Sequence, residues 1–172
     1  THLVVGAPKQ VLSGTGEVGA AHVYSINGGA FDRQTMLRPS EPQAGEKFGA
    51  AVALQGNQVV LGSPEWDGVN LQGQSQKDQG RVFVFEGSGS SWTRVARLTA
   101  DGGLSTADAS GEGIADDQFG YSVAIHGDYV AVGAPFVDTG SVLNAGAAYV
   151  FYELAPHGNS QLGSTWTRSS LT

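Results

Sequence analysis

The feature that most constrains this chain is an internal repeat, because self-similarity at a fixed period predicts one structural unit used several times. The clearest copy runs as FGYSVAIHGDYVAVGAP over 119–135, continues as GAAYVFYEL over 146–154, and ends as STWTRSSLT over 164–172. Its apolar segments are strand-sized and are separated by the Gly, Asn, Asp and Ser residues typical of tight turns. The copy therefore predicts four short strands.

Two further copies repeat the same order of segments. The middle copy consists of residues 48–64, 80–87 and 91–100. The first copy consists of residues 3–8, 19–28 and 30–39. Because the first copy enters the pattern at its second segment, it lacks the opening strand.

Composition agrees with an all-β chain. The 172 residues include 26 glycines and only 15% charged residues, with Val, Ala, Tyr and Phe grouped between turn residues. We predict four-stranded antiparallel sheets, two of them complete and one lacking its first strand. The expected units are a partial repeat with its linker over 1–47, a repeat with an acidic linker loop over 48–118, and a repeat over 119–172.

Two local signals indicate how these sheets are built and packed. Gly56-Asn57 and Gly127-Asp128 separate the first two strands of their copies by two residues, which predicts tight hairpins. The second strand at 130–134 is apolar at every position, so we expect both faces of its sheet to be covered. Sheets stacked face to face around an axis, as in the blades of a β-propeller, meet that requirement.

The motifs at the ends of these strands resemble a known family. Phe119-Gly120 opens one copy and Gly133-Ala134-Pro135 closes its second strand, while the middle copy has Phe48-Gly49 and Gly62-Ser63-Pro64. These elements resemble the FG-GAP repeat of integrin α-subunit propellers, and the resemblance covers essentially the whole chain. The segments that begin at Trp92 and Trp166 are similar to the version found in bacterial and algal surface proteins.

The resemblance implies a β-propeller of about seven blades, since closed propellers typically have roughly four to eight. This chain supplies fewer than three blades. The other blades would come from the same longer chain, which is the interpretation we prefer, or from other copies of this one.

The resemblance also implies a non-catalytic adhesion or binding module at the cell surface or outside the cell. Ligands would be proteins or glycans bound at one face by the loops at 9–18, 65–79 and 136–145 and by the linkers between repeats at 40–47 and 101–118. Two alternatives remain: a glycan-binding lectin-type propeller, and an architectural segment of a larger surface protein, filament or enzyme. A net charge of −7 with nine scattered basic residues argues against nucleic acid, and no apolar segment reaches membrane-helix length.

Trp66, Asp67 and Asn70 are the predicted ligand-binding residues, because an indole beside polar groups suits stacking on a sugar ring. Trp66 lies in a loop, whereas Trp92 and Trp166 recur at one repeat position and are expected to be structural. The alternative for Trp66 is an indole packed under its own loop.

Asp116, Asp117 and Asp138 are the predicted metal ligands, since the linker at 101–118 is acidic and faces the same side as Asp138. The alternative is a solvated acidic loop, because no Asp-x-Asp-x-Asp-Gly spacing is present. The integrin-type calcium loop between first and second strands is not expected here. The hairpins at 55–58 and 126–129 are too short to supply six to eight oxygen ligands.

No catalytic residue is predicted. The four histidines are scattered, and neither a nucleophile elbow nor a triad arrangement can be recognised. With no cysteine, thiolate chemistry is excluded. We therefore expect a protein that is not an enzyme.

Overall fold

The computed structural model describes residues 1–69, 74–100, 115–139, 141–153 and 166–169. Every regular element in these residues is a β-strand, and none is a helix. The all-β prediction is confirmed. Within the described residues there is also no long apolar helix of the kind that crosses a membrane.

The first sheet has three antiparallel strands in the order β1-β4-β5. Its strands are β1 (His2–Ala7), β4 (Ala20–Asn27) and β5 (Ala30–Leu37). A small hairpin of β2 (Val11–Leu12) and β3 (Gly16–Glu17) interrupts the connection from β1 to β4. The sequence predicted this connection as a plain loop, because two-residue strands are too short to show any periodicity.

The middle and last sheets each have four antiparallel strands in sequential order. The middle sheet consists of β6 (Ala51–Gln55), β7 (Gln58–Ser63), β10 (Arg81–Ser88) and β11 (Ser91–Leu98). The hairpin β8 (Gly68–Val69) and β9 (Ser75–Gln76) lies in its long connection. The last sheet consists of β12 (Ser122–His126), β13 (Tyr129–Ala134), β14 (Ala147–Glu153) and β15 (Trp166–Ser169).

Both predicted two-residue hairpins are present. Gln55 pairs with Gln58 and His126 pairs with Tyr129, so each turn contains only the two residues between. Gly56 and Gly127 both have a φ of 57°, a conformation that glycine adopts without steric cost.

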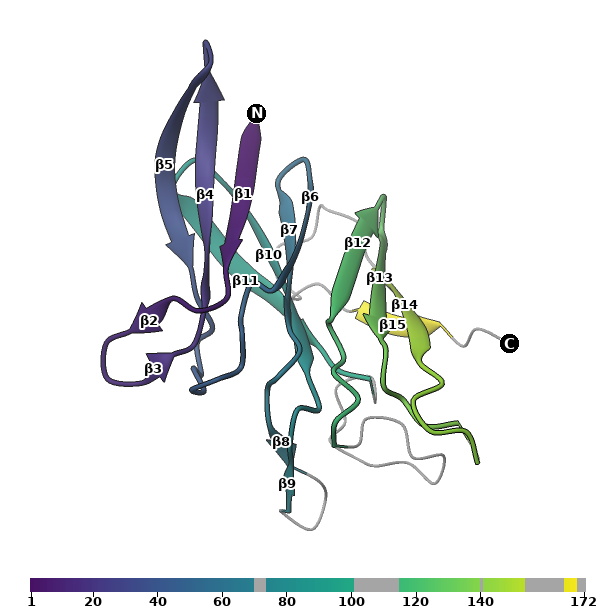
Figure 1. The fold of residues 1–172 in the computed structure, drawn as a ribbon. Coiled ribbons are helices and arrows are strands. Elements are labelled where there is room, and N and C mark those ends of the chain that lie inside the picture. Colours follow the sequence, from purple (N-terminus) through teal and green to yellow (C-terminus); the bar gives the residue numbers. More distant parts are fainter. Residues whose placement is uncertain (70–73, 101–114, 140, 154–165, 170–172) are drawn as a thin grey trace.

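The three sheets stand side by side in an open array, with β6 in contact with β1 on one side and β12 on the other (Figure 1). One apolar core fills the junction between the first and middle sheets, and it includes Val23, Phe48 and Leu61. A second core fills the junction between the middle and last sheets, and it includes Val82 and Phe119. The middle sheet is thus covered on both faces, and all six residues of β7 are buried.

For β13, the expectation that both faces are covered is wrong. Val130 and Val132 are buried against the middle sheet, but Tyr129 and Ala131 on the other face are exposed. This exposure follows from the place of the last sheet in the array, because among the described residues the middle sheet covers one face of β13 and no sheet covers the other.

The Phe-Gly dipeptides join neighbouring sheets. The Phe48 N–H donates to the Val18 carbonyl oxygen next to the first sheet (2.9 Å), and the Gly49 N–H donates to Gly62 within the middle sheet (2.9 Å). At the next junction, the Phe119 N–H donates to Gln79 in the same way (3.0 Å). Each dipeptide therefore bonds to its own sheet and to the segment that leads into the third strand of the neighbouring repeat.

Close contact between neighbouring sheets explains why a glycine closes the second strand. A Cβ atom on Gly62 would overlap the carbonyl oxygen of Gly120, and one on Gly6 would overlap that of Gly49. The backbone of each sheet therefore approaches its neighbour more closely than any side chain allows. These contacts give the recurring glycine a role in packing.

Candidate functional site

The long connections of all three sheets gather at one end of the molecule, which we call the loop end. Figure 1 shows the β2–β3 hairpin, the β8–β9 hairpin and the connection from β13 to β14 together at its bottom, and the tight turns at its top. We call that opposite end the turn end. This arrangement follows from the sheet order, because every second-to-third strand connection leaves its sheet on the same side.

Apolar side chains are exposed at the loop end. The described residues include ten exposed large apolar side chains, and half of them lie in these three connections. They are Val11, Val69, Phe136, Val142 and Leu143. Leu143 is the most exposed of them, at 74%. Exposed apolar groups that cluster on loops are typical of interaction surfaces.

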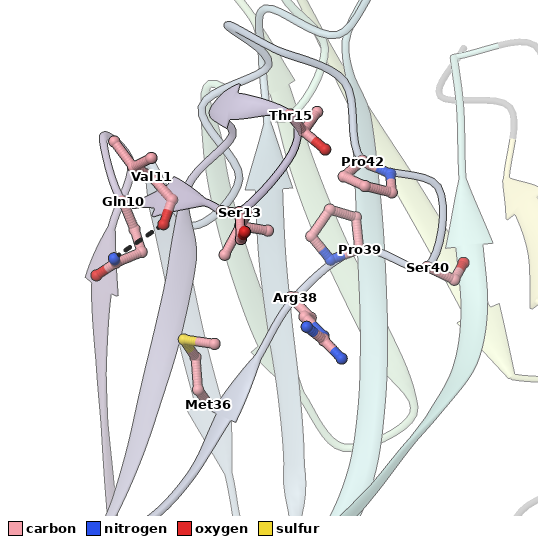
Figure 2. A pocket seen from close by; sticks show the side chains of 10 residues that line it. Gln10, Val11, Ser13, Thr15, Met36, Arg38, Pro39, Ser40 and Pro42 are labelled. Atoms are coloured by element: carbon pink, nitrogen blue, oxygen red, sulfur yellow. Dashed lines mark hydrogen bonds between the residues drawn. The ribbon is translucent and has the colours of Figure 1, made fainter.

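A pocket of about 460 Å³ opens between the β2–β3 hairpin and the segment that leaves β5. Figure 2 shows the side chains of Ser13 and Thr15 on the hairpin side and those of Arg38 and Ser40 on the other. Met36, Pro39 and Pro42 supply apolar surface. Arg38 is the only charged residue among those that line it. Sequence reasoning placed the loops at 9–18 and 40–47 on the same face but did not identify this pocket, because its two walls are about 25 residues apart in the chain.

Local chemistry fixes the two walls of the pocket. The hairpin turn closes through a hydrogen bond from the Thr15 N–H to the Leu12 carbonyl oxygen (3.1 Å), and Gly14 has a φ of 85° that suits glycine. The opposite wall contains Pro39, which is buried and whose ring restricts φ.

A buried ion pair connects the linker after β5, residues 38–47, to the middle sheet. The Arg81 side chain is 1% exposed and that of Glu46 is fully buried, with Arg81 Nη2 and Nε donating to Glu46 Oε2 at 2.7 and 3.0 Å. Arg81 Nη2 also donates to the Glu41 carbonyl oxygen (2.7 Å). Burial lowers the pKa of the Arg81 guanidinium, and the charge of Glu46 opposes that shift.

Trp66 packs on this ion pair. The Arg81 guanidinium lies 4.8 Å from the centroid of the Trp66 ring and 4.8 Å from that of Phe83, within the range of cation–π attraction. One face of the indole is thus in contact with protein, as the alternative interpretation of Trp66 proposed. The sequence does mark Arg81 as unusual, because the other copies have Ala20 and Ala147 at this repeat position, but it does not indicate that Trp66 is its neighbour.

Asp67 makes hydrogen bonds within the protein. Its carboxylate accepts a hydrogen bond from the Asp78 N–H (3.0 Å), and its own N–H donates to the side chain of Gln43 (2.6 Å). Asn70 lies outside the described residues. The proposed ligand-binding trio therefore stays a prediction, and its two described members have contacts within the protein.

The three predicted metal ligands occupy different surroundings. Asp116 is exposed with a φ of 69°, and its N–H donates to the Lys77 carbonyl oxygen (2.6 Å). Asp117 is buried, and the Asp138 carboxylate accepts from the Asn144 N–H (2.8 Å). Among the described residues no three His, Asp or Glu side chains gather as a metal site would require. Most of the acidic linker, residues 101–114, lies outside the described part, so the metal prediction stays untested there.

Two comparisons with known proteins bear on the whole chain. The family model of the FG-GAP repeat matches residues 31–85 and 92–151, more than half of the sequence. A comparison with curated proteins gives no significant match. Each match begins in the last strand of one sheet and ends in the third strand of the next, so it contains one complete junction between sheets.

Proposed function

Because the chain belongs to the FG-GAP repeat family, which occurs in extracellular adhesion-type β-propellers, we propose that it is a non-catalytic binding module of an extracellular or cell-surface protein. In this proposal its sheets are blades of a larger propeller of about seven blades. The ligand, a protein, binds at the loop end.

The observation that carries this proposal is the contrast between the two ends of the sheets. The loop end bears the exposed side chains of Val69, Phe136 and Leu143 on long connections, together with a pocket. The turn end bears tight glycine-containing turns such as Gly56-Asn57. Binding residues are commonly found on loops that a rigid scaffold positions. When a partner covers exposed apolar groups on such loops, their burial favours binding.

The test is an array of secreted and surface proteins and of glycans, probed with the labelled chain. Val69→Arg and Leu143→Arg place a charge on exposed apolar positions of the loop end, and each is expected to weaken binding to a protein ligand at least tenfold. Asn57→Arg and Asp128→Arg place the same side chain at the turn end and serve as matched controls.

Binding to proteins that is lost with the loop-end variants and kept with the turn-end variants supports the proposal. Equal loss with both pairs would contradict it. Binding only to glycans would favour the lectin-type alternative, and Trp66→Phe would then be the first variant to examine.

A further inference from the structure

We propose that the pocket beside the β2–β3 hairpin binds a carboxylate group on a protein ligand, an Asp or Glu side chain in an exposed segment of the partner. The inference rests on the proposed binding function, because it names the chemistry that one part of the loop end recognises. It is carried by the charge, polarity and shape of the pocket lining (Figure 2).

The charge of the pocket is opposite to that of the chain. The protein carries 16 acidic and nine basic residues, yet the described residues that line the pocket include Arg38 and no acidic residue. The nearby Glu41 carboxylate lies 3.8 Å from the Arg97 guanidinium, and Glu46 is paired with Arg81. In the described part of the chain, Arg38 has no carboxylate within ion-pair distance. An exposed guanidinium of this kind can take both oxygens of an incoming carboxylate.

Hydroxyl groups line the same pocket as this guanidinium. Ser13 and Thr15 line the pocket from the hairpin, and Ser40 lines it from the linker. The Ser40 oxygen accepts a hydrogen bond from Arg94 Nη1 (2.6 Å), so its own hydrogen remains available to donate. These hydroxyl donors can complete the shell of a carboxylate that Arg38 holds.

The rest of the lining favours a peptide over a sugar. Met36, Pro39 and Pro42 offer aliphatic surface on which the methylene groups of an acidic residue and its neighbour can pack. None of the described residues that line the pocket is aromatic, so they offer no stacking surface of the kind that sugar rings favour. The volume of about 460 Å³ suits one or two side chains.

The experiment is a titration of the chain, followed by NMR, with an end-blocked Leu-Asp dipeptide and its Leu-Asn counterpart. We expect Leu-Asp to bind at least tenfold more tightly than Leu-Asn, with shifts at the signals of residues 12–15 and 36–40. Rising salt concentration should weaken this binding, because it depends on one charge pair.

Arg38→Gln should abolish the difference between the two dipeptides, whereas Arg33→Gln, an exposed arginine on β5 outside the pocket, should preserve it. Unchanged melting temperatures would confirm that both variants fold. Equal binding of Leu-Asp and Leu-Asn, or unchanged Leu-Asp binding in Arg38→Gln, would overturn the inference. So would glucuronate binding that depends on Arg38 without Leu-Asp binding, because the carboxylate would then belong to a sugar.

The outcome separates this inference from the proposed function. If Leu143→Arg loses the array ligand while Arg38→Gln keeps it, the loop end is a binding surface and the pocket is not its carboxylate site. If neither variant changes array binding, the proposed function fails as well.

Discussion

The junctions between the sheets and the loop end differ in how strongly the structure constrains each residue. In the junctions, the Phe-Gly dipeptides at Phe48 and Phe119 make the same hydrogen bonds, and Gly6 and Gly62 meet the next sheet in the same way. At the loop end, two of the three connections contain 12 residues and the one in the middle sheet contains 17, and their exposed side chains differ. The junctions therefore act as a repeated framework, and the loop end is the part that can vary to suit a ligand.

This difference predicts which property each substitution should change. A change in a junction should lower the free energy of unfolding with little effect on ligand contacts. A change at the loop end should alter binding and leave stability nearly unchanged. Four sets of variants test this division between stability and binding.

The largest expected effect comes from the buried ion pair. Glu46→Ala leaves the Arg81 guanidinium buried without its carboxylate, and it removes the acceptor of the Gln43 N–H. Loss of one partner of such a pair typically costs about 3–5 kcal/mol. Urea denaturation measures this cost. The double variant Glu46→Leu with Arg81→Met should recover most of it, and a single variant as stable as the wild type would contradict the assignment.

The next effect compares one repeat position in two sheets. Leu61 is fully buried in the first junction, whereas Val5, at the same position of β1, is 44% exposed. Leu61→Ala should cost about 2–5 kcal/mol through the lost contacts and the cavity, and Val5→Ala less than about 1 kcal/mol. Thermal denaturation of both variants gives the comparison. Similar losses in the two would mean that the first sheet is covered as the middle one is.

A smaller effect is expected for the glycines that close the second strands. Gly62→Ala would bring a Cβ against the Gly120 backbone and should destabilise the chain by about 1–3 kcal/mol. At Gly133 an added Cβ meets mainly the movable Ser122 side chain, so Gly133→Ala should cost clearly less. Urea midpoints of the two variants measure the difference, and equal costs would argue against close backbone approach as the reason for this glycine.

The smallest effect on stability is expected at the loop end. Leu143 is 74% exposed, so Leu143→Arg should change the free energy of unfolding by no more than about 0.5 kcal/mol. Thermal denaturation of this variant, beside the binding array, tests the division between framework and loop end. A large loss of stability would show that Leu143 contributes to the fold.

The sequence was sufficient for the framework because its signals are local. Glycine followed by Asn or Asp between apolar runs predicted both tight turns, and the recurring Phe-Gly and Gly-x-Pro elements predicted the sheets that contain them. The match to the FG-GAP repeat confirms the family that these elements indicated.

The candidate site could not be predicted in the same way, because its contacts join distant segments. Trp66 meets Arg81, and Ser13 faces the same pocket as Arg38, yet nothing in the spacing of these residues indicates that they are neighbours. The exposed face of β13 was also missed, since an apolar strand has the same pattern whether one face or both are covered.

The most direct test of binding at the loop end is hydrogen–deuterium exchange of the chain with and without the protein ligand found on the array. Bound ligand should slow exchange in peptides that contain residues 9–18 and 136–145, and exchange at the turns 27–30, 55–58 and 126–129 should be unchanged. Slower exchange confined to those turns, or to the edge strands β1 and β5 of the first sheet, would contradict binding at the loop end.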